Sequence, residues 1–245
     1  MVWWEAVLLF AGGGAAGVVN AMAGGGSSLT VPLLVLAGVP GNFANGTNRV
    51  GIFVSNGTTI WSFHRQGINA YREALPFLFP VVIGSLIGSI AISQVTDRTF
   101  ETIFGILILP IIFLSLREPK TVRTGPNLSK TAIFLIFLCI GVYAGAIQMG
   151  VGLVLLAFLT RSGLTLMKAN FVKVLITLAV TMTALPVFII LGKVRWWPAL
   201  ILTAGLSIGG WLGARIAVRG GERTIRAFMI IAAIGLTGRL VGLYG

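Results

Sequence analysis

The stretch AGGGSSLTVPLL, residues 23–34, places three consecutive glycines, two serines and a proline inside a chain that is otherwise strongly apolar. Glycine and proline both lower the stability of a water-exposed helix. In hydrocarbon every backbone N–H and C=O must be paired, so irregular backbone is tolerated only where protein or a water-filled cavity surrounds it. If this stretch lies within a membrane, it therefore marks a position that lipid does not reach.

The composition is that of an integral membrane protein. The 245 residues are 56% hydrophobic and 10% charged, and the mean hydropathy is +0.98. Most of the apolar runs approach the length of about 20 residues that a helix needs to cross a bilayer, the clear exceptions being 27–38 and 151–160. The runs cover residues 3–22, 27–38, 50–63, 74–95, 99–116, 131–149, 151–160, 170–191, 198–217 and 224–243.

The spans are predicted to be helical. The runs are continuous and rich in Leu, Ile, Ala and Gly, without the alternation of a membrane β-barrel. The opening residues Met-Val-Trp-Trp-Glu lack the basic region and cleavage site of a secretory signal, so we expect the first run to be retained as a helix. The prediction is an all-α, multi-pass protein of a cell membrane, in a bacterium the inner membrane.

Several function classes are excluded by composition. The net charge of +12 comes from bases scattered over short connections, which favours orientation signals over a nucleic-acid site. One His, one Cys and no HExxH or Ser-His-Asp set leave too few groups for hydrolytic or metal chemistry, so we predict neither an enzyme nor a cofactor. The expected partners are the lipid bilayer and a small anionic substrate. A homo-oligomer is compatible with the sequence, which does not fix the oligomeric state.

Two halves of the chain repeat one another. Asp97-Arg98-Thr99-Phe100 and Glu222-Arg223-Thr224-Ile225 match in chemical type at a separation of 125 residues. The sequence therefore predicts a first transmembrane repeat over 1–118, a basic cytoplasmic linker over 119–128 and a second repeat over 129–245. Further residues at the same or nearly the same separation are Gly67 and Gly192, Gly84 and Gly209, Gly88 and Gly213, and Arg49 and Lys173.

The number of crossings in each half decides whether the repeats are parallel or inverted. If the short runs 27–38 and 151–160 re-enter without crossing, the connections place eight Lys and Arg residues on one side of the membrane and five on the other. If each run crosses, or supplies half of a broken crossing, ten lie on one side and three on the other. The second count fits the positive-inside rule better. It predicts two inverted repeats with discontinuous helices at the first spans of each half, an arrangement typical of transporters because one sequence builds both gates.

Glycines interrupt matching positions of the two halves, at 24–26 and at 150 and 152. Short interrupted segments of this kind point to a binding site, because the helix N-termini exposed there bind anions. Amide and hydroxyl side chains, which suit an oxyanion, lie near both breaks. The candidate substrate-binding residues are Asn20, Gly25, Gly26, Ser27, Ser28, Asn45, Thr47, Asn48, Arg49, Gln148, Gly150, Gly152, Asn170 and Lys173.

Some of these small and polar residues have structural alternatives. Helix capping remains open for Ser27, Ser28 and Thr47. The pairs Gly84-x-x-x-Gly88 and Gly209-x-x-x-Gly213 favour close helix packing over a site.

Arg49 and Lys173 are basic residues at matching repeat positions, each followed by a long apolar run. A charge at the bilayer centre costs on the order of 3 kcal/mol. All six acidic residues lie at segment ends or in connections, so we expect no mid-membrane carboxylate to neutralise these bases. A bound anion would do so. The sequence leaves open the alternative that both bases lie near helix ends and snorkel to the interface.

Three strings occur in order along the chain: GGGSSLTVPLL at 24–34, Gly38-Val39-Pro40, and ANGTNR at 44–49. A weaker second copy, without the Val-Pro pair, runs from Gly145 through Asn170 to Lys173. Over nearly its full length the chain thereby resembles the sulfite exporter TauE/SafE family of bacterial and plant membrane proteins. Members of that family are regarded as carriers of sulfite, sulfoacetate and related anions, commonly for export.

The resemblance implies a secondary transporter that exports a small sulfur-containing anion, such as sulfite, sulfoacetate or another sulfonate, by alternating access. An anion channel is the alternative, because it would share the fold and the basic residues but lack two closed gates. A third possibility is a structural subunit of a larger complex, but such a role would not require glycine breaks at matching positions of both halves.

The topology is testable by cysteine accessibility. In a background with Cys139 replaced by Ala, single cysteines at Arg117, Lys120 or Arg123 should resist impermeant thiol reagents in intact cells, because the linker is expected in the cytoplasm. Cysteines added at either terminus should be labelled. Labelling of the linker from outside would contradict the assignment.

Overall fold

The computed structural model of the chain describes residues 2–22, 24–116 and 129–240, with backbone alone for 108–116 and 221–240. Over these ranges the secondary structure is helical, with no strand. The helices are α1 (Trp3–Met22), α2 (Ser27–Leu36), α3 (Gly41–Arg65), α4 (Tyr71–Ser93), α5 (Asp97–Leu116), α6 (Lys130–Ala146), α7 (Val151–Arg161), α8 (Leu166–Ile190) and α9 (Trp196–Leu240). The predicted linker, 119–128, lies outside the described residues.

Four of the described helices are long and apolar enough to cross a membrane. They are α1, α4, α8 and the Trp196–Gly220 part of α9. The 25-residue helix α3 is also long enough, but its polar side chains lower its hydropathy. Most of those polar side chains are buried against other helices, so the polar face of α3 lies inside the protein.

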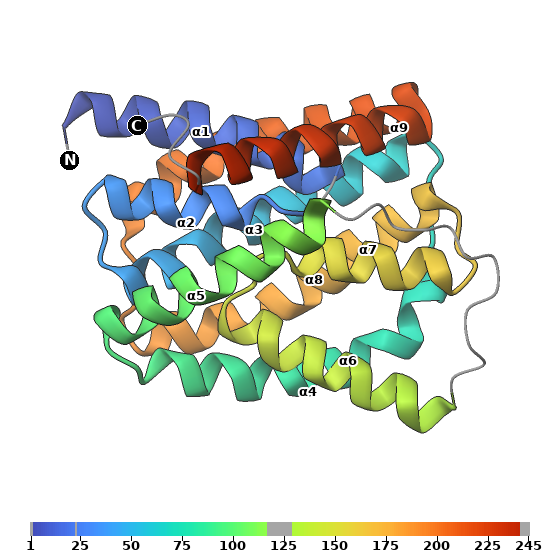
Figure 1. The fold of residues 1–245 in the computed structure, drawn as a ribbon, viewed down its shortest axis with the longest axis horizontal. Coiled ribbons are helices and arrows are strands. Elements are labelled where there is room, and N and C mark those ends of the chain that lie inside the picture. The colour runs from blue at the N-terminus through green and yellow to red at the C-terminus, as the bar shows by residue number, and fades with distance from the viewer. Residues whose placement is uncertain (1, 23, 117–128, 241–245) are drawn as a thin grey trace.

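The two short helices pair with the helices that precede them. Figure 1 shows α1 and α2 as one antiparallel pair, and α6 and α7 as another that enters from the opposite end of the molecule. The α2–α3, α4–α5 and α8–α9 connections share one end, whereas the α3–α4 and α7–α8 connections share the other (Figure 1). This grouping of connections is the one that the second count of basic residues assumes. Which end faces the cytoplasm stays a prediction.

Glycines allow two helix pairs to approach closely. A Cβ added at Gly88 of α4 would overlap the carbonyl oxygen of Val142 in α6, and one added at Gly209 of α9 would overlap that of Gly14 in α1. Gly84 and Gly213 pack in the same way against α6 and α1. The prediction that both Gly-x-x-x-Gly pairs serve helix packing is therefore confirmed.

The helix boundaries differ from the apolar runs at two places. Hydropathy had placed Asn45, Thr47 and Asn48 beside a break, before the apolar run 50–63. Helix α3 begins at Gly41, so these three residues lie within a helix. Hydropathy misses this part because its polar side chains are covered by protein, not lipid. The last two apolar runs, 198–217 and 224–243, fall within the helical residues of α9 as far as Leu240.

Replacing Gly88 by Ala should destabilise the protein by about 1–3 kcal/mol, because the added methyl overpacks the α4–α6 contact. The midpoint of thermal unfolding in detergent, followed by intrinsic fluorescence, should fall. Gly57→Ala is the matched control, since a Cβ at Gly57 meets no atom within 4 Å. Equal midpoints for the two variants would contradict this account of the packing.

Candidate functional site

In each antiparallel pair the chain reverses direction at a glycine-containing break, and the two breaks touch. α1 ends at Met22 before α2 begins at Ser27, and α6 ends at Ala146 before α7 begins at Val151. Gly24 and Gly150 have positive φ angles of 85° and 68°, which favour glycine. A Cβ added at Gly24 would lie 2.5 Å from the Cα of Gly152, so glycine lets the two backbones meet.

Arg49 of α3 reaches the end of the interrupted helix α6. Its guanidinium donates to the carbonyl oxygens of Gly145 and of Ala146, the latter at 3.2 Å, and to that of Ala144 at 3.4 Å. The ring of Phe188 lies 4.8 Å away on one side. The last carbonyls of a helix lack intrahelical donors and carry its negative dipole end, so a cation is favoured there. Arg49 is fully buried and does not snorkel.

Lys173 of α8 makes the corresponding contact with the end of α1. Its ammonium donates to the carbonyl oxygen of Asn20 at 2.9 Å and to that of Ala21 at 3.5 Å. The side chain is 1% exposed, so the snorkelling alternative does not hold for Lys173 either. Each base thus lies at the carbonyl end of a helix that precedes a glycine break, in the other half of the sequence.

Two asparagines also bind helix-end carbonyls of the opposite half. Asn45 donates from its amide nitrogen to the carbonyl oxygen of Ala146 at 2.8 Å, and Asn170 donates to that of Ala21 at 2.9 Å. The donor Asn170 lies 125 residues after the donor Asn45, and the acceptor Ala21 lies 125 residues before the acceptor Ala146. The same capping contact is therefore made twice, once in each direction between the halves.

The site retains unused hydrogen-bonding capacity. Among the described residues, buried polar atoms without a partner include Ser28 Oγ, Arg49 Nε and the amide oxygens of Asn45, Gln148 and Asn170. An unpaired buried polar group costs about 1–3 kcal/mol, and its occurrence in a native structure calls for an explanation. The five atoms named here belong to residues that the sequence nominated as ligands of an anion, whereas Asn42, Asn56 and Ser207, which also have such atoms, were not nominated.

The serines at the start of α2 do not cap it. Ser27 and Ser28 are buried as its first residues, and no side chain of the N-terminal turn makes a capping hydrogen bond. Asn48 accepts a hydrogen bond from Thr30 at 2.6 Å, which ties α2 to α3. Asn20 donates to the side chain of Asn56 at 3.3 Å and so ties α1 to α3.

Thr47 lies away from both interruptions. Its hydroxyl accepts the backbone N–H of Arg195 at 2.9 Å, immediately before α9 begins at Trp196. Of the candidate residues, Thr47 therefore holds the α8–α9 connection and does not join the group around the helix breaks. It lies on the same helix as Asn45 and Arg49 but presents its hydroxyl to a different neighbour.

The sequence nominated Gln148 at the second break but missed two other residues that shape it, Thr181 and Tyr143. Gln148 has a positive φ of 62°, uncommon for a residue other than glycine, and donates to Thr181 Oγ1 at 2.8 Å. Thr181 follows Lys173 and Thr177 at a spacing of four, so helical periodicity offered a signal for it. The hydroxyl of Tyr143 donates to the carbonyl oxygen of Met149 at 2.7 Å. An aromatic residue within an apolar run gave no such signal.

Sequence comparison identifies the family. Residues 9–240 match the family described as Sulfite exporter TauE/SafE. The chain belongs to this family. It is 28% identical to the probable membrane transporter protein ORF9 of a Sinorhizobium species, over 95% of this chain and 91% of the relative. It is 26% identical to a probable membrane transporter protein of Haemophilus influenzae, over 96% and 93% of the two chains.

A third relative is the probable membrane transporter protein YfcA of Escherichia coli K12, 27% identical over 92% of this chain and 86% of the relative. No solved structure matches the chain. Together with the four apolar spans, the family and these relatives make the chain a multi-pass membrane protein and a probable transporter.

Asn45→Ala and Asn170→Ala should each lower the free energy of unfolding by about 1–3 kcal/mol, since each leaves a buried helix-end carbonyl with fewer donors. Exposed Asn69 provides the control, and Asn69→Ala should change stability by less than about 0.5 kcal/mol. Thermal unfolding of the purified variants measures the difference. If Asn45→Ala and Asn170→Ala behaved like the control, the capping contacts would contribute nothing to stability.

Proposed function

We propose that the protein is a secondary transporter that exports small sulfur-containing anions, such as sulfite, sulfoacetate or another sulfonate, by alternating access of two inverted repeats. The observation that carries the proposal is the burial of Arg49 and Lys173 at the two helix interruptions. Membership of the TauE/SafE family supports transport and, through the family's description, a sulfur oxyanion.

Electrostatics at the interruptions favours a negative solute. No described carboxylate contacts Arg49 or Lys173: Glu73 pairs with Lys168 at 2.9 Å, and Asp97 accepts the backbone N–H of Asn42 at 2.8 Å. Among the described residues, the two bases are balanced by the partial charges of carbonyl groups, worth about half an elementary charge at a helix end, and Arg49 also by the ring of Phe188. The surplus positive charge is what an anion would neutralise.

Two helix N-termini add donors to the same region. α2 begins at Ser27 and α7 at Val151, immediately after the glycine breaks. The first N–H groups of a helix have no intrahelical acceptor, and the positive dipole end favours an anion. A sulfite or sulfonate group offers three oxygens that accept several hydrogen bonds at once, which suits a site built from backbone N–H, hydroxyl, amide and guanidinium donors.

Inverted repeats are supported by several features that recur in the second half. Positive φ angles occur at Gly38 and Gly67 and again, 125 residues later, at Gly163 and Gly192. The α1–α9 packing of small residues is likewise repeated between α6 and α4. In the transport cycle that we propose, one half rocks against the other, and an anion replaces the helix-end carbonyls as the partner of Arg49 and Lys173.

Export needs little further coupling. A membrane potential that is negative inside drives an anion outward with about 2.3 kcal/mol per unit charge per 100 mV. Import against that potential would require protons or another ion.

Transport by purified protein in liposomes tests the proposal. Sulfite flux should be saturable and should show counterflow, and Arg49→Gln or Lys173→Gln should reduce it at least about tenfold, a loss of about 1.4 kcal/mol of interaction. Arg98→Gln, which removes an exposed base at the start of α5, is the control and should transport normally. Arg49→Lys and Lys173→Arg keep the charge and should retain part of the flux, which separates loss of charge from misfolding.

The outcomes discriminate between the candidate functions. Normal flux in either glutamine variant would remove that base from the binding site. Single-channel currents without counterflow would favour the anion channel over the carrier. Saturable flux of carboxylates with no flux of sulfite or sulfonates would keep the transporter but reject the sulfur substrate.

A further inference from the structure

Two Trp-x-x-x-Arg pairs face each other near the end of α3, away from the helix interruptions. In α3 the guanidinium of Arg65 lies 5.4 Å from the ring centroid of Trp61, and in α9 that of Arg215 lies 3.9 Å from the ring centroid of Trp211. Stacking on an indole holds the guanidinium plane in place while its N–H edge remains available. An arginine held over a ring in this way can still donate its N–H groups to an anion.

The pairs enclose a cavity of about 310 Å³ between α3 and α9. A hydrogen bond from Ser62 Oγ to the carbonyl oxygen of Trp211 at 3.2 Å joins its two walls, and the Gln66 amide donates to the carbonyl oxygen of Ser62 at 2.9 Å within the α3 wall. The cavity is lined by Trp61, Ser62, Arg65, Gln66, Trp211 and Arg215. None of the candidate transport residues lines it, so it is separate from the proposed transport site.

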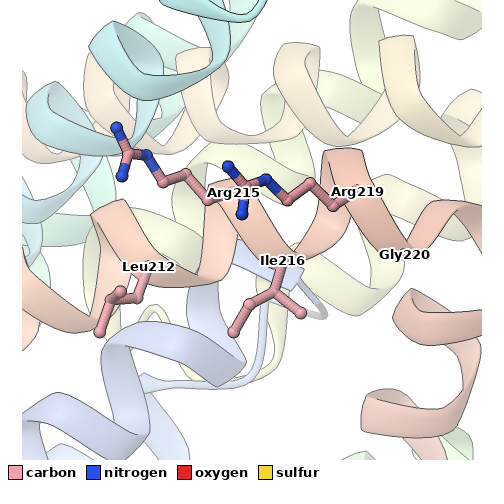
Figure 2. A pocket seen from close by; sticks show the side chains of 5 residues that line it. All are labelled: Leu212, Arg215, Ile216, Arg219 and Gly220. Atoms are coloured by element: carbon pink, nitrogen blue, oxygen red, sulfur yellow. The ribbon is translucent and has the colours of Figure 1, made fainter.

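A second cavity, of about 450 Å³, shares Arg215 with the first and continues along α9. Figure 2 shows Arg215 and Arg219 extending from α9 toward the same side, whereas Leu212 and Ile216 extend toward the other. Leu212 and Ile216 are 40% and 36% exposed, so the basic groups adjoin an apolar surface that is open to lipid. A charged end beside an apolar wall is the shape of a lipid, not of a small free anion.

The charge of this region is uncompensated by the described part of the chain. Arg65, Arg215 and Arg219 are exposed, and none forms a salt bridge with a described carboxylate. Arginine binds phosphate oxygens through two parallel N–H donors, so two arginines that line one cavity suit one phosphodiester group. A zwitterionic headgroup would bring its own cation toward these bases and bind less well.

The position in the fold also fits a headgroup. Arg65 is the last residue of α3, and Trp61 is 54% exposed one turn before it, as in an aromatic belt at the bilayer surface. This end of the molecule carries the α3–α4 and α7–α8 connections with Arg65, Arg72, Arg161 and Lys168. The positive-inside rule assigns such an end to the cytoplasm, and the cytoplasmic leaflet attracts basic segments through its anionic lipids.

We propose that the cavity between the two Trp-x-x-x-Arg pairs binds the headgroup phosphate of an anionic phospholipid on Arg65 and Arg215. Arg219 adds positive charge beside the headgroup. The acyl chains follow the apolar surface of Leu212 and Ile216. The site is independent of the transported substrate and does not rest on the proposed function.

Fluorescence quenching by brominated lipids tests this site directly. Trp61 and Trp211 line the cavity, and replacing the other four tryptophans of the chain, Trp3, Trp4, Trp196 and Trp197, by Phe leaves these two as the only indole fluorophores. The full-length protein in mixed micelles is titrated with brominated phosphatidylglycerol or brominated phosphatidylcholine. Phosphatidylglycerol should quench at about tenfold lower mole fraction than phosphatidylcholine.

Charge removal supplies the matched comparison. Arg65→Gln with Arg215→Gln should abolish the tenfold preference, whereas Arg98→Gln, which removes one exposed base far from the cavity, should retain it. The double variant should unfold at the wild-type temperature, which shows that it is folded. A single Arg215→Lys replacement should keep part of the preference. Equal quenching by both lipids in the parent would overturn the proposal. Loss of the preference on adding millimolar inorganic phosphate would overturn it too, since it would indicate a free-anion site.

Discussion

The fold depends on how helix ends are satisfied where no water is available. α1 and α6 both end inside the protein, and each leaves backbone carbonyls that an apolar medium would penalise by several kcal/mol. The structure satisfies them with side chains from the opposite half, an amide and a base for each helix end. Each half of the chain therefore depends on the other, because side chains of the opposite half bind the last carbonyls of α1 and α6.

This mutual capping explains why charge is tolerated so deep in the molecule. Arg49 and Lys173 are at once the partners of helix-end carbonyls and the strongest positive charges near the glycine breaks. A group that holds two halves together and also attracts an anion couples binding to the relative position of the halves. Under the proposed function, that coupling is how a substrate would bias an equilibrium between two arrangements, since it has different affinities for them.

Much of this could be predicted from the sequence where side chains carry the signal. Gly24 and Gly150 lie where α1 and α6 have ended, because glycine and the αL conformation are tightly linked. The polar first part of α3 was missed, since hydropathy cannot distinguish a polar helix covered by protein from a loop. The capping contacts had no signal at all, because their acceptors are backbone carbonyls, which any residue carries, and these lie about a hundred residues or more from the donors.

Locating the bound anion tests the central claim most directly. Selenite has the shape and charge of sulfite, and its selenium atom gives an anomalous signal in crystals of the protein. The account predicts a peak between the first turns of α2 and α7, within hydrogen-bonding reach of Arg49 and Lys173. A peak confined to the surface arginines Arg65 and Arg215, with both buried bases still held only by helix-end carbonyls at saturating selenite, would contradict it.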